Sequence, residues 1–168
     1  VGFGEINRKL LKILKLFSKN ISISNRSIIK NKNIKSYFNL KRLSQAVKKK
    51  RFIINTLPIT FETKNIFNKS VFKNFEKNAI FINYGRGDTV DFNDLKKYSK
   101  LKKLVLCLDV FNTKHYINPY EPTPNNFYFS NKFLNIVTPH IGAYDNSYWD
   151  KQIELFSKNL RKFIDILH

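Results

Sequence analysis

Phe81-Ile-Asn-Tyr-Gly-Arg-Gly87 is the stretch that decides how the rest of the chain is interpreted. Its apolar start predicts a short buried strand, and its two glycines let other backbone approach the turn closely. Between them, Arg86 would present a guanidinium, a rigid fork of donors suited to carboxylates, at the edge of a sheet. A lone Arg-Gly pair is usually a solvated turn, so this interpretation depends on the motifs that accompany it.

Strand and helix patterns alternate along the chain. Strand-like runs lie at residues 21–24, 52–56, 79–84, 104–109 and 136–137, and residues 25–36 are predicted to be a polar loop. Helical patterns lie at about residues 5–18, 68–75, 91–98 and 146–167, with a short helix capped by Asn39. This alternation predicts an α/β fold, a doubly wound parallel sheet (Rossmann-like), lacking most of its first strand because the chain opens at Val1 beside a Gly-rich turn.

The run Leu104-Val-Leu-Cys-Leu-Asp109 is apolar up to its last residue. Such a run is typical of a strand that is covered on both faces of a parallel sheet. We therefore expect Cys107 to be a buried thiol. Because it is the single cysteine, an internal disulfide is excluded, which fits a reducing, cytoplasmic setting.

Composition narrows the function classes. A chain of 168 residues predicts one domain, and a hydrophobic content of 42% excludes a disordered chain. No apolar stretch has the length of a membrane helix, so we expect no membrane association. The formal net charge is +19, but the lysines are spread through every predicted helix. We therefore expect weak binding to polyanions and no specific nucleic-acid partner.

The first residues match the front of a dinucleotide-binding fingerprint. Gly2-Phe3-Gly4 precedes a helix, and such glycines let backbone close on a pyrophosphate at the helix N-terminus. Asn7 stands where the third glycine belongs, so either the packing of helix on strand is looser or the helix is shifted.

The second strand ends in Asn25-Arg26-Ser27, with no acidic residue to hold ribose hydroxyls. Arg26 suits a 2′-phosphate, which favours NADPH over NAD. A solvated loop arginine is the alternative, and the sequence weighs the two equally.

The order of these motifs resembles the NAD(P)-binding domain of the D-isomer-specific 2-hydroxyacid dehydrogenases, in particular the glyoxylate/hydroxypyruvate reductases. The resemblance covers about residues 1–145 and rests on Gly2-Phe-Gly4, Asn55-Thr-Leu-Pro58 with Glu62-Thr63, Asn83-Tyr-Gly-Arg86-Gly87 with Val90-Asp91, Leu108-Asp109-Val-Phe111 and Thr138-Pro-His140-Ile141. It implies a division into an NAD(P)-binding domain at 1–145 and a C-terminal helix at 146–168. That helix would return toward an N-terminal substrate domain that this sequence lacks.

The resemblance also implies hydride transfer from NAD(P)H to a small 2-oxo acid, with Arg86, Glu121 and His140 as catalytic residues. The chemistry is consistent with these types, because histidine titrates near neutral pH, a carboxylate orients it, and arginine clamps a substrate carboxylate. Glu121-Pro122 matches the family's Glu-Pro pair only if an insertion follows Phe111; otherwise Lys114 occupies that place.

The implied cofactor contacts run through the whole chain, with Asp109 at the nicotinamide carboxamide and Thr63 near the ribose–phosphate portion. The full set is Gly2, Phe3, Gly4, Glu5, Ile6, Asn25, Arg26, Leu57, Pro58, Thr63, Tyr84, Gly85, Arg86, Asp109, His140 and Gly142. No metal is expected. Relatives commonly dimerise through this domain, so a homodimer is expected of the full-length protein. The alternative function is a catalytically inactive NAD(P)-binding regulatory relative.

Overall fold

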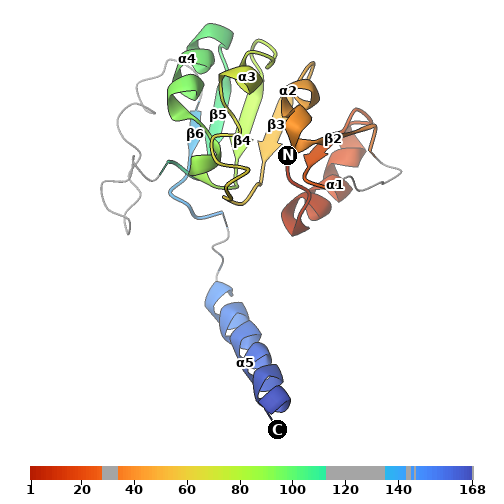
Figure 1. Ribbon diagram of the computed structural model, residues 1–168, viewed down its shortest axis with the longest axis vertical. Helices are drawn as coiled ribbons and strands as arrows, with labels where there is room; N and C mark the ends of the chain where they lie inside the picture. The colour runs from red at the N-terminus through yellow and green to blue at the C-terminus, as the bar shows by residue number, and fades with distance from the viewer. Residues whose placement is uncertain (28–33, 113–134, 143–144, 146, 168) are drawn as a thin grey trace.

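The computed structural model of the protein describes residues 1–27, 34–112, 135–142, 145 and 147–167 (Figure 1). Its strands form a two-stranded sheet in the order β1-β2 and a four-stranded sheet in the order β3-β4-β5-β6, and every pair is parallel. The strands are β1 (Ser22–Asn25), β2 (Ser36–Asn39), β3 (Phe52–Asn55), β4 (Ile80–Asn83), β5 (Val105–Leu108) and β6 (Asn135–Val137).

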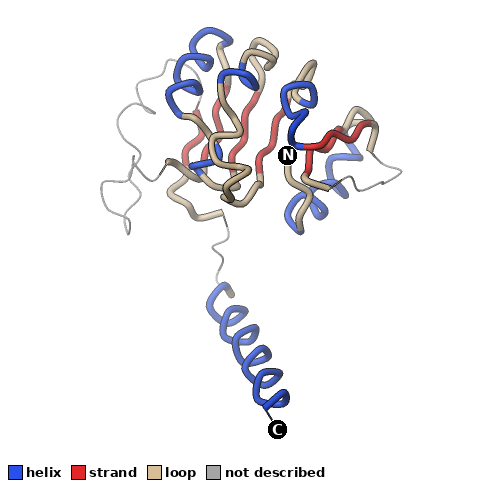
Figure 2. The backbone as a smooth tube through the Cα atoms, viewed as in Figure 1, coloured by secondary structure: helices blue, strands red, loops and turns tan. Residues whose placement is uncertain are grey.

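Helices connect these strands (Figure 2). They are α1 (Glu5–Phe17), η1 (Leu40–Arg42), α2 (Leu43–Ala46), α3 (Lys69–Phe72), η2 (Gly87–Thr89), α4 (Phe92–Lys102) and α5 (Tyr148–Leu167). Side chains cap two of them: Asn39 caps η1 by accepting from the N–H of Lys41, as the sequence predicted, and Asp91 caps α4 by accepting from the N–H groups of Asn93 and Asp94.

Val1 and Gly2 lie between the two sheets. The N–H of Gly2 donates to the carbonyl of Ser24 across 2.8 Å, and the N–H of Thr56 donates to the carbonyl of Val1 across 3.0 Å. All strands therefore run in one direction and bring their carboxyl ends to one edge. The predicted parallel α/β fold is confirmed.

The core fills one face of the four-stranded sheet. Ile53, Phe81 and Leu106 lie side by side on this face and are buried under α2, α3 and α4. The rings of Phe67, Phe72, Phe75 and Phe81 pack against one another within it in tilted and edge-to-face pairs, and the ring centroids of Phe67 and Phe81 are 5.1 Å apart.

The opposite face differs from the prediction. Ile54, Ile82 and Cys107 lie side by side there and are only half-buried, so Cys107 is not the fully buried thiol that the apolar run predicted. An apolar run predicts that both faces of a strand are covered. It does not show how much of each face is covered by residues of this chain.

Strand β2 was not predicted either. Residues 25–36 were interpreted as a loop leading to a helix cap, whereas residues 36–39 pair with β1. All four residues of β2 are half-buried and lack a clear alternation, which is the signal that marks a strand in sequence.

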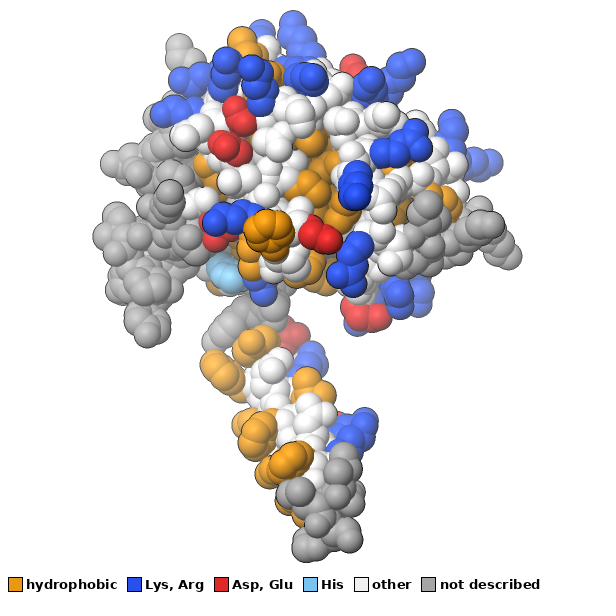
Figure 3. All heavy atoms as spheres, viewed as in Figure 1, with side chains coloured by type: hydrophobic (Ala, Val, Ile, Leu, Met, Phe, Trp, Pro, Cys, Tyr) orange, Lys and Arg blue, Asp and Glu red, His pale blue; other side chains and the backbone are white. Residues whose placement is uncertain are grey.

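Helix α5 extends away from the sheets (Figures 1 and 2). One stripe of its apolar side chains is exposed, and Figure 3 shows these side chains along the helix. The stripe comprises Trp149, Ile153, Phe156, Leu160 and Phe163.

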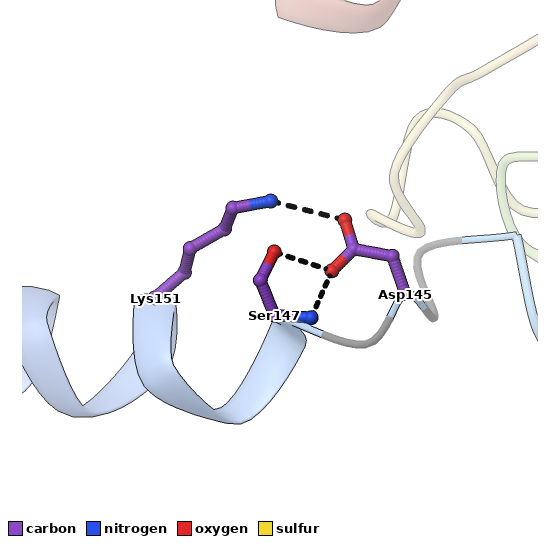
Figure 4. Close-up of polar contacts among 3 residues, drawn as sticks. All are labelled: Asp145, Ser147 and Lys151. Carbon is purple, nitrogen blue, oxygen red and sulfur yellow. Dashed lines mark hydrogen bonds and ion pairs between the residues drawn. The ribbon is translucent and has the colours of Figure 1, made fainter.

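Asp145 stabilises the start of α5. Its Oδ1 accepts from the N–H and hydroxyl of Ser147, and its Oδ2 pairs with Lys151 Nζ across 3.0 Å (Figure 4). Within the described residues, no helix has the length and apolar character needed to cross a membrane.

Candidate active site

The turn at residues 84–87, here called the arginine turn, is wedged between two other backbone segments. A Cβ added at Gly85 would lie 2.5 Å from the carbonyl oxygen of Leu57. One added at Gly87 would lie 1.7 Å from the carbonyl oxygen of Phe111. Both glycines are therefore required for space, and the turn holds Arg86 at the carboxyl edge of the sheet.

A buried network of polar side chains binds the main chain of the arginine turn. Asn55 Nδ2 donates to Asn83 Oδ1 across 2.9 Å and to Thr89 Oγ1 across 2.8 Å. Asn83 Oδ1 also accepts from the N–H of Gly85, and Thr89 Oγ1 donates to the carbonyl of Arg86 across 2.6 Å. The main chain of the turn is thus bound at two points, while the Arg86 side chain is exposed and its Nη1 donates to the carbonyl of Gly85.

The turn at residues 138–142, here called the histidine turn, is bound to Asp109 at the end of β5. Asp109 is 3% exposed, and its Oδ1 accepts from Thr138 Oγ1 across 2.5 Å. Oδ1 also accepts from the N–H of Ile141, and Oδ2 accepts from the N–H of Gly142, each across 3.0 Å. A carboxylate has about four acceptor positions, so this leaves capacity for one further donor.

His140 adopts a left-handed backbone conformation, with φ of +56°, and its side chain is exposed. This conformation is uncommon for a residue other than glycine and persists only where surrounding contacts impose it. Asp109 supplies those contacts on the C-terminal side of His140.

The arginine turn and the histidine turn meet at Gly142. A Cβ there would lie 2.5 Å from Tyr84 Cε1 and 2.8 Å from Asp109 Oδ2. Arg86 and His140, which are 54 positions apart by their numbers in the chain, are therefore carried by two turns in direct contact. The predicted third member, Glu121, and its alternative, Lys114, lie outside the described residues.

The Gly-rich turn is suited to a pyrophosphate. Gly2 has φ of +80°, which favours glycine, and nothing lies within 4 Å of a Cβ built on Gly4. Helix α1 begins directly after this open position, and no side chain caps it. Its first N–H groups and the positive end of its dipole therefore face a space that an anion can fill.

Asn7 replaces close packing by hydrogen bonds. Its Nδ2 lies 2.7 Å from the carbonyl oxygen of Gly2 and 2.8 Å from Thr56 Oγ1. The side chain thus ties α1 to the Gly-rich turn and to the end of β3. Sequence reasoning noted the missing glycine but did not foresee this link.

The remaining predicted contacts line the same edge. Leu57 is buried and its N–H donates to Asn55 Oδ1, whereas Pro58 is exposed. Thr63 is buried, and its hydroxyl donates to the carbonyl of Pro58 across 2.7 Å, so it shapes the loop that carries Pro58. Its contact with a cofactor stays a prediction.

The sheet edge has a feature that the motifs did not include. Each of the strands β1 to β4 ends in asparagine, and Asn25 pairs in register with Asn39 as Asn55 does with Asn83. Each amide bonds to backbone or side chains at the start of a following turn. In the sequence, the recurrence of asparagine at the ends of successive strands was the signal that could have revealed this feature.

Residues 1–142 match the family model described as "D-isomer specific 2-hydroxyacid dehydrogenase, NAD binding domain". The chain belongs to the D-isomer specific 2-hydroxyacid dehydrogenase family. The resemblance inferred from the five motifs is therefore confirmed.

Several curated relatives of this chain are named glyoxylate reductase. The protein from Pyrococcus horikoshii is 30% identical over 164 residues, covering 97% of this chain and 47% of the relative. The protein from Thermococcus litoralis is 32% identical over 165 residues, covering 97% and 47%. The chain thus spans about half the length of the curated relatives it matches.

Solved structures of 2-hydroxyacid dehydrogenases share the fold. The family protein from Aeromonas salmonicida is 28% identical with a TM-score of 0.79, covering 98% of this chain and 50% of that one. A family protein from Xanthobacter autotrophicus Py2, in complex with NADPH and MES, has a TM-score of 0.80 at 19% identity, covering 98% and 64%.

Proposed function

We propose that the protein to which this chain belongs reduces a small 2-oxo acid of the glyoxylate or hydroxypyruvate type with NAD(P)H. The observation that carries the proposal is the contact between the two turns. Asp109 binds the histidine turn, and Gly142 of that turn lies against Tyr84 of the arginine turn. A guanidinium and an imidazole are thereby presented at one edge of an NAD-binding domain.

The chain's own residues would divide the chemistry between them. Arg86 is exposed on a turn bound at both ends, so its guanidinium can hold a substrate carboxylate in a fixed orientation. His140 would donate a proton to the carbonyl oxygen, and Glu121 would orient the imidazole. The bound cofactor would supply the hydride that reduces the carbonyl carbon to an alcohol.

NADPH is the proposed cofactor in preference to NADH. Asn25 ends β1 and Arg26 follows it, at the place where an acidic residue would favour NADH, and Arg26 is exposed there. Gly2, Gly4 and the first turn of α1 would hold the pyrophosphate.

The direct test is NADPH oxidation by protein expressed from the complete gene, with glyoxylate and with hydroxypyruvate. We expect turnover with one or both acids and a loss of roughly a hundredfold to ten-thousandfold in kcat/KM for Arg86→Ala and for His140→Asn. Arg51→Ala is the matched control, because Arg51 is exposed and precedes β3 at the opposite edge of the sheet. Absence of turnover with both acids would contradict the proposal.

A second candidate is a regulatory protein that binds NAD(P) without catalysis. Two features favour this second candidate. Asn7 replaces the third glycine of the fingerprint, and His140 would lack its orienting carboxylate if Lys114, and not Glu121, stands beside it. Cofactor binding that persists without turnover and is unchanged in Arg86→Ala would identify this second function.

The assembly is also a proposal. Residues 1–145 would form the NAD(P)-binding domain, and residues 146–168 the helix that returns to a substrate domain. The exposed apolar stripe of α5 supports this division, because such a stripe is normally covered. We further propose that the full-length protein is a homodimer, and sedimentation of the full-length protein measures this.

We also propose a cytoplasmic location, because a single cysteine fits a reducing setting. Cell fractionation tests this location.

A further inference from the structure

Asn7 stands where the dinucleotide-binding fingerprint has its third glycine, and its side chain is half-buried. Its Nδ2 lies 2.7 Å from the carbonyl oxygen of Gly2, 2.8 Å from Thr56 Oγ1 and 3.3 Å from the carbonyl oxygen of Val1. An amide nitrogen carries two hydrogens, so the two shorter contacts use both of them. A glycine at this position has no side chain and could make neither bond.

The acceptors of Asn7 belong to the segment that gives the Gly-rich turn its shape. Gly2 has φ of +80°, and its N–H donates to the carbonyl of Ser24 across 2.8 Å. The N–H of Thr56 donates to the carbonyl of Val1 across 3.0 Å. Both backbone bonds lie before the carbonyl of Gly2, so Asn7 adds a third point of attachment after them, where a glycine would otherwise let the chain rotate.

This attachment bears on the place where a pyrophosphate would sit. The carbonyl of Gly2 leads through Phe3 to Gly4, where a Cβ would have nothing within 4 Å, and α1 begins directly after it. The first N–H groups of a helix have no partner within the helix and are available to an anion. The apparent affinity for that anion falls with the fraction of molecules whose turn is in the binding conformation. The hydrogen bonds of Asn7 raise this fraction.

We propose that Asn7 is a positioning residue for the cofactor pyrophosphate, because its hydrogen bonds to Gly2 and Thr56 hold the Gly-rich turn in the conformation that binds. This inference rests on the proposed function and gives the departure from the fingerprint a role in it. The bonds of Asn7 replace the close packing of helix on strand that the third glycine normally permits. Restoring the glycine should therefore weaken cofactor binding.

The first test is calorimetric titration of the 168-residue chain with NADPH and with ADP-ribose, which has the pyrophosphate but no nicotinamide. We expect Asn7→Ala to weaken both ligands by about fivefold to tenfold, the order expected when one or two hydrogen bonds are lost. Alanine is the best helix former, so a less stable α1 would not explain the loss. Asn7→Gly, which restores the fingerprint, should weaken both ligands at least as much.

Thr56 provides the matched variants. Thr56→Val keeps the shape of the side chain but removes the hydroxyl that Asn7 binds, and should weaken both ligands by about threefold, whereas Thr56→Ser keeps the hydroxyl and should bind as the native chain does. The double variant should lose little more than Asn7→Ala alone, because the two changes break the same bond. Asn93→Ala is the control for the substitution itself, since Asn93 is exposed on α4.

The second test is the steady-state kinetics of NADPH oxidation by protein expressed from the complete gene. The pyrophosphate keeps its charge while hydride is transferred, so Asn7 contributes equally to the ground state and the transition state. We expect Asn7→Ala to raise the KM for NADPH by about fivefold to tenfold and to leave kcat within about twofold. A fall in kcat at unchanged KM would overturn the inference.

The outcomes separate this inference from the proposed function. If Asn7→Ala or Asn7→Gly binds NADPH as tightly as the native chain, or more tightly, the inference is overturned while the proposed reaction stands. If both variants bind more weakly but no 2-oxo acid is reduced, the inference is supported and the proposed reaction fails. If neither nucleotide binds the native chain, both are overturned.

Discussion

Asn55 and Asn83 end neighbouring parallel strands at paired positions, and Asn55 Nδ2 donates to Asn83 Oδ1 across 2.9 Å. Both side chains are 0% exposed. Through the N–H of Leu57 and the N–H of Gly85, this pair fixes the two loops that follow β3 and β4. A buried pair of this kind is stabilising only while every donor and acceptor in it is satisfied.

Replacing Asn83 by Ala should therefore lower the free energy of unfolding by about 2–4 kcal/mol, because the N–H of Gly85 and the amide of Asn55 lose their acceptor in a dry site. Urea denaturation measures the change. Asn93→Ala is the control, since Asn93 is exposed on α4 and should change stability by no more than about 0.5 kcal/mol. Equal midpoints for the two variants would show that the network adds nothing to stability.

Gly87→Ala should destabilise the protein by roughly 2–4 kcal/mol, because its Cβ would meet the backbone of Phe111 at 1.7 Å and one segment must move. Gly4→Ala places the same methyl group where nothing lies within 4 Å. We expect its cost to stay below about 1 kcal/mol. Thermal unfolding of both variants makes the comparison, and a similar loss in each would contradict the wedged geometry.

Thr138→Val keeps the shape of the side chain but removes the hydroxyl that donates to Asp109. We expect the histidine turn to open more often, so that the amides of Ile141 and Gly142 exchange with deuterium about fivefold to tenfold faster, equivalent to about 1 kcal/mol. Thr138→Ser retains the donor and should restore the native exchange rate. Unchanged exchange in Thr138→Val would mean that the backbone bonds alone hold the turn.

Burial raises the pKa of the Cys107 thiol above its ordinary value. The folded state therefore keeps the proton at a pH where the unfolded chain has lost it, so folding stability should fall as pH rises through the thiol range above about 9. Alkylation by iodoacetamide at pH 8 should be slower in the native protein than in urea. A native rate equal to the urea rate would refute this, and Cys107→Ser should remove this group's part of the alkaline loss.

Hydrogen bonds from Ser147, and then the Lys151 ammonium, lower the pKa of Asp145 below its ordinary value. A lowered carboxyl pKa means that its stabilisation of the start of α5 is present above the ordinary aspartate range and is lost as pH falls through the folded pKa. Carbon-detected NMR titration should show the pKa of Asp145 rising toward its ordinary value in Ser147→Ala. A smaller rise is expected in Lys151→Ala, and no rise in either would exclude these contacts as the cause.

The local patterns were sufficient for most of the fold. Apolar runs located β3, β4 and β5, and the helical periodicity located α1 and α5, because these signals depend on neighbours a few positions apart. Strand β2 was missed because its residues are evenly half-buried, so its pairing with β1 leaves no alternation in the sequence.

The candidate site divides in the same way. Arg86, Asp109 and His140 were assigned to one site by the resemblance to the family. The structure gives the physical reason for their proximity, because they follow the neighbouring parallel strands β4, β5 and β6, which end at one edge. The hydrogen bonds of Asn7 with Thr56, and of Asn39 with Arg26 and Lys41, depend on side-chain directions that spacing does not reveal.

The sequence by itself determined the α/β fold, the order of the motifs and the family. Only the tertiary structure decided that Asn55 meets Asn83, that Gly142 meets Tyr84, and that the second face of the sheet is half-covered. The physical reason is distance along the chain. The contact between Asn55 and Asn83 spans 28 positions, and it forms only where β3 and β4 pair in parallel and in this register.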